Sequence, residues 1–581
     1  MFEKVLVANR GEIAIRVFRT LREMGIASVA VYSEADRDTP FVALADEAYL
    51  IGPGPSPQSY LQGERIIEVA RRAGADAVHP GFGFLAENPE FARGCAAAGV
   101  VFIGPPPEAM EAMGSKTSAR EVMAAAGVPI VPGGTDPIVT LADARRTAEE
   151  IGYPVAIKAA AGGGGKGIRV VRAADELESA FAASRREGKT YFADDTVYLE
   201  RYLDDPRHIE VQVLADNHGH VIHLGERDCT IQRRHQKLIE ETPSPAVSAD
   251  LRERIGAIAV NAARAVGYTG AGTIEGLLAA DGSWYFLEMN TRLQVEHTVT
   301  EMVTGLDLVR EQVWIASGRP LGWAQSDVRL YGHAIQCRIN AEDAAAGFVP
   351  TPGRITTYRE PAGPGVRVDS GVEAGTDVSG LYDPMFAKLV VWDEDRDLAR
   401  RRMARALDEY EIGGITTLIP LHRAIMRHPE FAAAGTMRDF VEGGGFAREY
   451  EAPDAEHSAG GGVVGEVRRH VAEVDGKRFE VTVEVPEHPG RTRLRARREA
   501  LAEREAAAHG AHDVVRSPMQ GTVLSVGVAA GDQVAAGQVL VVVEAMKMEN
   551  EIVAHHAGEV EAVEVAQGDA VTNGQTLVRL A

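Results

Sequence analysis

Two acidic residues lie where a hairpin would bring them face to face. The stretch TIEGLLAADGSWYFLEMN, residues 273–290, has an Asp-Gly pair between two apolar runs, which indicates a β-hairpin with a two-residue turn. Folding the runs about that turn pairs Leu277 with Phe286 and Glu275 with Glu288. The second pair places two carboxylates directly opposite each other on one face of the sheet, where they repel.

A cation between the two carboxylates would remove this repulsion. Hard divalent ions such as Mg²⁺ prefer oxygen ligands from the protein and from nucleotide phosphates. Asn290, two residues after Glu288, faces the same side and adds a third oxygen. A solvated acidic edge is the alternative, but the neighbouring pairs are apolar. The sequence therefore favours a metal site at Glu275, Glu288 and Asn290.

Polar side chains continue along this face if the strand stays extended through NTRLQVEH. Alternate residues of a strand point the same way, and here they are acceptors, a cation, an amide and a carboxylate. This is not a core pattern; it predicts an anion site beside the metal site, with Glu296 as a candidate general base. The line consists of Glu288, Asn290, Arg292, Gln294 and Glu296.

A glycine-rich loop is the second candidate for chemistry. VAIKAAAGGGGKGIRVV, residues 155–171, places four consecutive glycines between two apolar strands. A Walker loop has a glycine, four residues and then Gly-Lys-Ser/Thr, and leads into a helix. Here Ala160 stands at the first glycine position and a strand follows. We expect a hairpin flap whose N–H groups approach phosphate, with Lys116 and Lys158 as point charges; a flexible exposed turn is the alternative.

Near the end of the chain, EAMKMEN places Lys547 between two methionines. The residues around it repeat, with Gly521 matching Gly558 at an offset of 37 that holds through Gly-Asp and Gly-Gln turns. Both halves alternate apolar and polar residues, which predicts two related halves of a small β-sandwich. Lys547 lies in the segment that joins them and is expected at a hairpin tip; a surface lysine between chance methionines is the alternative.

The elements that must position these residues alternate strands and helices. KVLVA (4–8) and SVAVY (28–32) are typical of buried strands, and apolar residues at helical spacing lie between them, which predicts a βαβ unit of a doubly wound domain. The turn has one glycine, so the dinucleotide-binding fingerprint is absent. Mixed α+β segments follow. Between about 451 and 512, Gly-rich and Arg/Glu/Ala-rich stretches predict a linker or a partner-docking surface.

Composition narrows the class of protein. The chain has 581 residues and a formal net charge of −23, which argues against a broad nucleic-acid footprint. Three cysteines form no disulfide framework and no paired metal-ligand spacing. The first residues do not resemble a signal peptide, and no run of about 18 apolar residues predicts a membrane span. We expect a multidomain cytoplasmic protein that binds neither nucleic acid nor a membrane.

Together these segments resemble known families. Residues 1–446 resemble the ATP-grasp biotin carboxylases, and the repeated β-domain is similar to the biotinyl carrier domain of biotin-dependent carboxylases. A lipoyl carrier shares the fold logic, but Met-Lys-Met favours biotin. The motifs that carry the resemblance are ANRGEIA, HPGFGFLAEN, GSK, GGGGKG, YLERYLDDPRHIEVQV, ERDCTIQRRHQK, EMNTRLQVEH, CRINAED, YDPMFAKL and EAMKMEN.

The resemblance implies an α/β and α+β multidomain fold. The expected domains are a doubly wound N-terminal domain at 1–114, an ATP-grasp domain at 115–330 with a mobile lid at about 131–204, a C-terminal α+β domain at 331–446, a linker with a subunit-docking segment at 447–512 and a β-sandwich biotinyl domain at 513–581.

The resemblance also assigns roles to residues. The catalytic residues are Arg292, Glu296 and Lys237, and two Mg²⁺ or Mn²⁺ ions are held by Glu275, Glu288 and Asn290. Bicarbonate is bound by Lys237, Arg292, Gln294 and the backbone of Val295. Biotin is bound by Arg338 and attached covalently to Lys547. ATP is bound by Lys116, Lys158, Gly164, Gly165, Glu200, Arg201, Tyr202, Leu203, His208, Gln232 and His235.

The implied reaction carboxylates biotin with the energy of ATP. Glu296 deprotonates bicarbonate, which attacks the γ-phosphate while Arg292, Lys237 and the metal ions neutralise the developing charge. The resulting carboxyphosphate yields CO₂ and phosphate. Phosphate then removes the N1 proton of biotin, and the ring attacks CO₂.

Partners follow from the same resemblance. Biotin protein ligase is the transient partner that attaches biotin. No carboxyltransferase is recognisable in the sequence, so we expect a separate carboxyltransferase β subunit in a hetero-oligomer, as for α subunits of acyl-CoA carboxylases that act on acetyl- or propionyl-CoA. The alternatives are another acceptor (3-methylcrotonyl-CoA, geranyl-CoA, pyruvate or urea), a carboxylate–amine ligase with a lipoyl-like tail, and a non-catalytic carrier.

Overall fold

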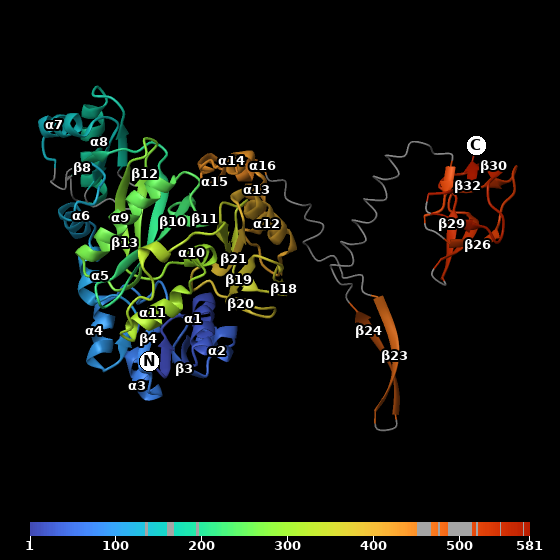
Figure 1. The fold of residues 1–581 in the computed structure, drawn as a ribbon, viewed down its shortest axis with the longest axis horizontal. Coiled ribbons are helices and arrows are strands. Elements are labelled where there is room, and N and C mark those ends of the chain that lie inside the picture. Colours follow the sequence, from blue (N-terminus) through green and yellow to red (C-terminus); the bar gives the residue numbers. More distant parts are fainter. Residues whose placement is uncertain are drawn as a thin grey trace. The chain divides into compact units, whose positions relative to one another are not determined.

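The chain divides into two units, Met1–Glu451 and Ala452–Ala581. The computed structural model (Figure 1) describes residues 1–133, 138–159, 168–192, 197–449, 466–474, 477–485, 514–518, 521–545, 548–572 and 574–580.

The first hundred residues form a parallel sheet covered by helices. Its order is β3-β2-β1-β4-β5, and every neighbouring pair is parallel, so the βαβ prediction is confirmed. The strands are β1 (Lys4–Val7), β2 (Ala27–Ser33), β3 (Glu47–Gly52), β4 (Ala77–His79) and β5 (Val101–Phe102); the helices are α1 (Gly11–Glu23), α2 (Pro40–Leu44), α3 (Gly63–Ala73), α4 (Pro89–Ala97) and α5 (Pro107–Gly114).

A three-stranded sheet carries the glycine-rich segment. Its order is β7-β6-β8, with β6 antiparallel to both neighbours. Lys158 on β6 stands opposite Ile168 on β7, so a strand and not a helix follows the glycines, as predicted. Residues 160–167 lie outside the described part of the chain. The elements are β6 (Val155–Ala159), β7 (Ile168–Val171), β8 (Val197–Arg201), α6 (Lys116–Ala125), α7 (Leu141–Ile151) and α8 (Leu177–Phe192).

An eight-stranded antiparallel sheet is the frame of the candidate site. Its order is β13-β12-β9-β10-β11-β14-β21-β19. The strands are β9 (Arg207–Ala215), β10 (Val221–Arg233), β11 (Gln236–Thr242), β12 (Gly270–Leu278), β13 (Trp284–Asn290), β14 (His333–Asn340), β19 (Val366–Ser370) and β21 (Met385–Asp393). Strand β11 pairs with β14, so residues before and after position 330 share one sheet.

Helices and short strands complete this unit. Residues of α10, β14 and β21 share one small apolar cluster (Val299, Val303, Ala334 and Val390), and α12 and α13 supply residues of the largest C-terminal cluster. The helices are α9 (Ala249–Ala265), α10 (His297–Thr304), α11 (Leu308–Ala316), α12 (Arg396–Glu409), α13 (Ile419–Arg427), α14 (Pro429–Ala432), α15 (Arg438–Val441) and α16 (Gly445–Glu449). The short strands are β15 (Glu342–Asp343), β16 (Val349–Pro350), β17 (Gly353–Arg354), β18 (Thr357–Arg359), β20 (Asp377–Val378) and β22 (Glu411–Gly413).

The predicted repeat is visible in the C-terminal β-domain. Two four-stranded sheets, β25-β32-β30-β27 and β29-β28-β26-β31, enclose one apolar core. The strands are β25 (Val514–Arg516), β26 (Gly521–Val526), β27 (Gln533–Val534), β28 (Val539–Ala545), β29 (Met548–Val553), β30 (Gly558–Val563), β31 (Ala570–Val571) and β32 (Thr576–Leu580). The first residues of β26 and β30, of β27 and β31, and of β28 and β32 each differ by 37 positions (558 − 521, 570 − 533 and 576 − 539).

The turns of the two halves match as well. Asp532 accepts a hydrogen bond from the N–H of Ala529 at 2.8 Å, and Asp569 does the same with Ala566. The glycine before each aspartate has a positive φ, 95° and 92°, which explains why glycine stands there. Ala545 pairs with Met548 across the hairpin β28–β29; Lys547, which the sequence placed at this tip, lies outside the described residues.

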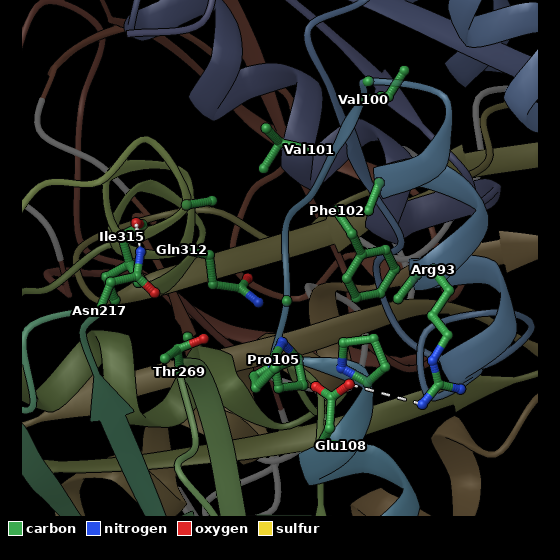
Figure 2. A pocket seen from close by; sticks show the side chains of 18 residues that line it. Arg93, Val100, Val101, Phe102, Pro105, Glu108, Asn217, Thr269, Gln312 and Ile315 are labelled. Atoms are coloured by element: carbon green, nitrogen blue, oxygen red, sulfur yellow. Dashed lines mark hydrogen bonds and ion pairs between the residues drawn. The ribbon is translucent and has the colours of Figure 1, made fainter.

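A two-stranded ribbon precedes the C-terminal β-domain in the sequence. Strands β23 (Glu466–Val474) and β24 (Lys477–Val485) form a two-stranded antiparallel ribbon. A cavity of about 730 Å³ lies between α4, β5, α11 and the start of β12, where Phe102 and Ile315 are among its walls (Figure 2). No predicted site residue lines this cavity, so it is separate from the candidate site. The helices of the described residues include no segment with the length and apolar character of a membrane span.

Candidate active site

Three carboxylates lie in one row across neighbouring strands. Glu210 on β9 stands opposite Glu275 on β12, which stands opposite Glu288 on β13. The predicted pairing of Glu275 with Glu288 is therefore confirmed, and the acidic row is one residue longer than expected. Opposite residues of an antiparallel sheet share a face, so this row attracts cations.

The hairpin turn itself differs from the prediction. The ladder pairs Leu277 with Tyr285 and not with Phe286. The N–H of Ala279 bonds to the carbonyl of Ser283, so the loop has three residues, and its glycine has φ 81°. A three-residue loop with a left-handed glycine shifts the register by one. The bulge that follows in the ladder compensates and brings the two glutamates opposite each other.

The prediction that the strand stays extended through NTRLQVEH is wrong. Strand β13 ends at Asn290, and α10 begins at His297. Strand β13 is the edge strand, and its outer side carries one isolated bridge, between Phe286 and Ile130. Among the described residues, no second ladder therefore holds the chain extended beyond Asn290. The polar side chains converge all the same: the amides of Asn290 and Gln294 both donate to Glu275 Oε1, the first at 2.8 Å.

Lys237 on β11 reaches into the acidic row. Its ammonium lies 2.5 Å from Glu210 Oε2, 2.8 Å from Glu275 Oε1 and 2.7 Å from Glu296 Oε1. Burial lowers the pKa of this ammonium, but the carboxylates of Glu210 and Glu296 outweigh burial and raise the pKa well above its ordinary value. Lys237 therefore stays positively charged at the centre of the site.

Glu296 lies between two cations. Its Oε1 contacts Lys237, and its Oε2 lies 3.0 Å from a guanidinium nitrogen of Arg338. Burial alone would raise the pKa of this carboxyl, but Lys237, Arg338 and Arg227 hold the pKa well below its usual range. Glu296 is thus ionised at neutral pH, as a proton acceptor must be.

The other predicted cations of the site are also held in place. Arg292 donates to Asn290 Oδ1 at 2.7 Å and to Glu87 Oε2 at 2.9 Å. Arg338, on β14, donates through Nε to Glu240 Oε1 at 2.6 Å in addition to its contact with Glu296. Each arginine therefore has a fixed orientation before any substrate arrives, which is the preorganisation that stabilises developing charge.

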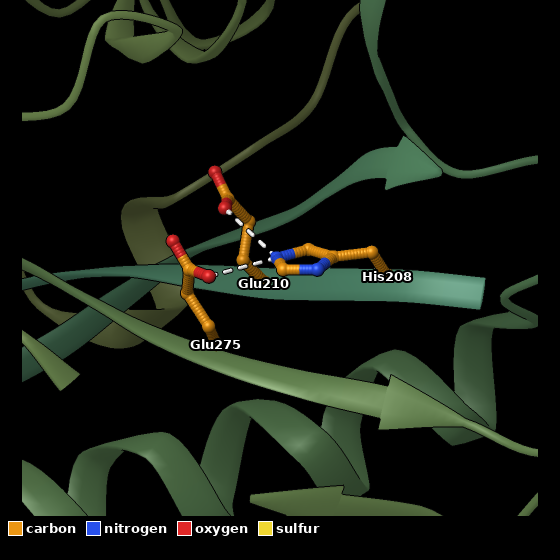
Figure 3. Close-up of side chains that lie close together, drawn as sticks. All are labelled: His208, Glu210 and Glu275. Carbon is orange, nitrogen blue, oxygen red and sulfur yellow. Dashed lines mark ion pairs between the residues drawn. The ribbon is translucent and has the colours of Figure 1, made fainter. Parts of the chain in front are cut away.

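The predicted nucleotide residues border the same row. The Nε2 atom of His208 lies 2.9 Å from Glu275 Oε2 and 3.8 Å from Glu210 Oε2 (Figure 3). Gln232 donates to the carbonyl of Cys229 at 2.7 Å, and His235 lies in the turn between β10 and β11 with φ 67°. His208 lies on β9, Gln232 on β10 and His235 in the turn after β10, so one sheet positions both the predicted nucleotide residues and the acidic row.

Other residues predicted to bind ATP lie in or directly after strands of the three-stranded sheet. Glu200 and Arg201 end β8, and the N–H of Tyr202 bonds to the carbonyl of Pro154 at 2.9 Å; Leu203 follows directly and is partly buried. The backbones of Lys116, at the start of α6, and of Lys158, in β6, are described but their side chains are not. Gly164 and Gly165 lie outside the described residues.

Four families match successive parts of the chain. They are the families described as "Biotin carboxylase, N-terminal domain" (residues 1–110), "Carbamoyl-phosphate synthase L chain, ATP binding domain" (115–324), "Biotin carboxylase C-terminal domain" (336–443) and "Biotin-requiring enzyme" (513–580).

Individual relatives extend the likeness over almost the whole chain. A pyruvate carboxylase subunit of Methanothermobacter thermautotrophicus is 55% identical over 443 residues, 76% of this chain and 90% of that protein. The biotin-dependent acyl-coenzyme A carboxylase alpha3 subunit of Mycobacterium leprae is 43% identical over 582 residues, 96% of this chain and 94% of that protein. This chain belongs to the biotin-dependent carboxylases.

A solved structure supports the fold of this biotin-dependent carboxylase. The biotin carboxylase domain of the Hydrogenobacter thermophilus 2-oxoglutarate carboxylase, in complex with MgADP, ADP and bicarbonate, has a TM-score of 0.70 and 48% identity, and covers 78% of this chain and 100% of that one. The predicted ATP-grasp biotin carboxylase fold with a C-terminal biotinyl domain is confirmed, and the chain is a biotin carboxylase, an ATP-dependent ligase.

Sequence reasoning missed residues that the biotin carboxylase fold brings into the site. Arg227, on β10 and 0% exposed, is the clearest: its guanidinium donates to Glu210, Gln212, Thr273, Gln294 and Thr300. It orients both a carboxylate of the acidic row, Glu210, and the side-chain amide of Gln294 in the loop between β13 and α10. Glu210, Glu240 and Glu87 were missed too, because their partners lie on strands and loops distant in sequence.

Proposed function

We propose that this carboxylase couples ATP cleavage to the carboxylation of biotin on its own Lys547 and supplies the carboxyl group to a separate carboxyltransferase subunit. The observation that carries the proposal is the environment of Glu296, a buried ionised carboxylate that contacts Lys237 and Arg338 beside a row of acidic side chains. A base, two cations and an acidic row in one pocket suit the activation of bicarbonate by ATP.

Bicarbonate would be held by Lys237, Arg292, Gln294 and the backbone N–H of Val295. Both cations already contact carboxylates, so an incoming anion competes with Glu296 and Glu87 for them. When bicarbonate draws Lys237 toward itself, Glu296 loses part of the positive field that lowers its pKa and becomes a stronger base. Glu296 then takes the bicarbonate proton, and the resulting dianion attacks the γ-phosphate of ATP.

The acidic row suits a hard metal ion. Glu275, Glu288 and Asn290 present oxygen atoms from two neighbouring strands, and oxygen-only donor sets fit Mg²⁺ or Mn²⁺. Two ions held there would neutralise phosphate charge and orient the nucleotide. The nucleotide would lie between the row and the three-stranded sheet, where His208, Gln232 and the backbone around Tyr202 are its neighbours.

Biotin would approach from the side of Arg338. Its guanidinium is fixed by Glu240 and Glu296, so it offers a preorganised positive charge to the ring oxygen as the ring nitrogen loses its proton. The carrier on Lys547 makes the delivery intramolecular, which raises the effective concentration of biotin at the site. Biotin protein ligase would attach the group beforehand.

We propose acetyl- or propionyl-CoA as the acceptor, used by a carboxyltransferase β subunit in a hetero-oligomer. The support is the extent of the match to the acyl-coenzyme A carboxylase alpha3 subunit, which covers 96% of this chain, compared with 76% for the pyruvate carboxylase subunit. The segment 447–512 would then dock the β subunit, and its ribbon β23–β24 offers the edges of a two-stranded sheet.

Pyruvate is the second candidate, because the relative with 55% identity is named a pyruvate carboxylase subunit. Other acyl-CoA acceptors, including 3-methylcrotonyl-CoA and geranyl-CoA, and urea depend on the same unknown partner. Purification with the bound partner chains, followed by carboxylation assays across these acceptors, separates the possibilities.

Replacing Glu288 with Gln tests the metal end of the proposal. The change removes one charge from the acidic row without altering its volume. We expect the Mg²⁺ concentration for half-maximal ATP cleavage to rise by at least about tenfold, measured as phosphate release with bicarbonate and free biotin present.

The matched control is Glu253→Gln on the exposed surface of α9. It makes the same chemical change far from the row, so its Mg²⁺ dependence should equal that of the wild type. An unchanged Mg²⁺ dependence in Glu288→Gln would refute the metal assignment.

A further inference from the structure

A fully buried lysine contacts the loop between β13 and α10. Lys388 on β21 stands directly opposite Arg338 on β14 and Asp369 on β19, and its side chain is 0% exposed. It ends the YDPMFAK part of a motif that carries the family resemblance, yet the proposed reaction does not use it. A buried ammonium is strongly disfavoured unless charges and hydrogen bonds compensate it, so its position requires a reason.

The ammonium of Lys388 connects separate parts of the fold. Its Nζ lies 3.2 Å from the carbonyl oxygen of Val295, 3.1 Å from Glu12 Oε2 and 3.8 Å from Asp369 Oδ2. The ring of Phe82 lies 5.9 Å away, within cation–π range. Both carboxylates face the ammonium, although Asp369 also accepts two hydrogen bonds from Arg367. The hydrogen bond of the lysine to Val295 reaches the loop between β13 and α10.

That hydrogen bond fixes the direction of a peptide group. In a trans peptide the C=O and the following N–H point in opposite directions. The carbonyl of Gln294 accepts from His297 Nδ1 at 2.7 Å, and the carbonyl of Val295 accepts from Lys388. Two successive carbonyls are therefore tied to buried groups, and the N–H groups of Val295 and Glu296 point the opposite way from them.

Helix stability does not explain this arrangement. Val295 lies at the N-terminal end of α10, whose first residue is His297. The helix macrodipole disfavours a cation at that end, so Lys388 does not stabilise the helix by its charge. Glu12 and Asp369 offset this unfavourable position.

We infer that Lys388 is a positioning residue for bicarbonate: it holds the Val295 peptide so that the loop presents its N–H groups to the anion. The inference rests on the proposed bicarbonate site. Removing the ammonium frees the loop and weakens bicarbonate binding, whereas removing its carboxylate partner leaves the hydrogen bond to Val295 in place.

Three variants of the full chain separate this role from simple ion pairing. Glu12→Gln breaks the ion pair and keeps the ammonium. Lys388→Met removes the ammonium and leaves Glu12 buried without its partner, which endangers folding. The double variant Lys388→Met/Glu12→Gln removes both charges, so it should fold even if the single lysine variant does not.

Two readouts are compared across the variants. The first is hydrogen–deuterium exchange of the amides in the peptide spanning residues 293–299, and the second is the KM for bicarbonate beside the KM for ATP. In the double variant we expect the exchange rate of that peptide to rise by about tenfold or more, and the KM for bicarbonate to rise by about tenfold or more. The KM for ATP should be unchanged. Glu12→Gln should match the wild type in the exchange rate, in the KM for bicarbonate and in the KM for ATP.

Each outcome decides the inference. If exchange and the KM for bicarbonate change equally in Glu12→Gln and in the double variant, the ion pair alone matters and the positioning role is wrong. Wild-type exchange of the 293–299 peptide in the double variant would also overturn the positioning role. If the wild type itself shows no bicarbonate-dependent ATP cleavage, the proposed function fails, and the exchange data still judge whether Lys388 holds the loop.

Discussion

Replacing Glu296 with Gln should lower the bicarbonate-dependent rate of ATP cleavage by at least about a hundredfold, which is the usual contribution of a positioned general base. Gln keeps the size of the side chain and can still hydrogen bond, but it cannot accept the bicarbonate proton. The exchange also removes the negative charge that Glu296 presents to Lys237 and Arg338. Phosphate release at saturating ATP and Mg²⁺, with and without bicarbonate, measures the effect.

The pH dependence of the wild type adds to this test. Lys237, Arg338 and Arg227 hold the pKa of Glu296 well below the ordinary value of 4.5. Because this pKa is lowered, Glu296 stays ionised as the pH falls to 4.5 and below. Protonation of Glu296 in the free enzyme should therefore cause no loss of kcat/KM for bicarbonate between pH 7 and pH 5. The control for Glu296→Gln is Glu311→Gln, which makes the same exchange at another buried glutamate, on α11. A Glu296→Gln enzyme with normal activity would exclude Glu296 as the base.

Replacing Lys547 with Arg should abolish the attachment of biotin completely. Attachment requires an amine that forms an amide with the biotin carboxyl group, and the guanidinium of arginine is too weak a nucleophile. The variant should bind no avidin probe and should leave the carrier uncarboxylated. Cleavage of ATP with free biotin should continue at the wild-type rate, because the acidic row and Glu296 belong to the other unit of the chain.

The matched control for the carrier is Lys4→Arg, which makes the same exchange at the start of the N-terminal sheet. This variant should be labelled like the wild type. Persistent labelling of Lys547→Arg would move the attachment site elsewhere, and loss of free-biotin activity in that variant would mean that the carrier tip has a second role in catalysis.

Local sequence patterns predicted the strands well where turn residues and the alternation of apolar and polar residues define them. The offset of 37 residues between the halves of the biotinyl domain is reproduced in three pairs of strands, because the Gly-Asp and Gly-Gln turns set where each strand begins. The pairing of Glu275 with Glu288 was also predicted, although for a partly mistaken reason: the loop is one residue longer than a two-residue turn, and a bulge cancels the shift.

The residues beyond β13 show where such reasoning fails. Alternation predicted that Gln294 and Glu296 continue the line of the strand, but no ladder among the described residues holds this edge strand extended beyond Asn290. Gln294 reaches the site from the loop after β13, and Glu296 from the residue before α10. Their convergence on Glu275 and Lys237 is a property of the tertiary fold that no period in the sequence reports.

The buried cations were the hardest part of the site to predict. Arg227 and Lys388 belong to strands that read as ordinary amphipathic or apolar segments, and their partners lie far away in sequence: Thr300 for Arg227 and Glu12 for Lys388. Thr300 lies on α10 and Glu12 on α1, so only the packing of these helices against the eight-stranded sheet brings the partners together. Charged residues in otherwise apolar strands are the one signal that marks them as candidates for a site.

Carboxylation of the carrier by its own chain can be measured on the purified, biotinylated protein without any other protein. The chain is incubated with ¹⁴C-bicarbonate, ATP and Mg²⁺, and the radioactivity retained on the protein is measured at neutral pH and after brief acidification. We predict acid-labile label that requires ATP and is absent from both Lys547→Arg and Glu296→Gln. A fully biotinylated wild-type chain that cleaves ATP but retains no label would contradict the account.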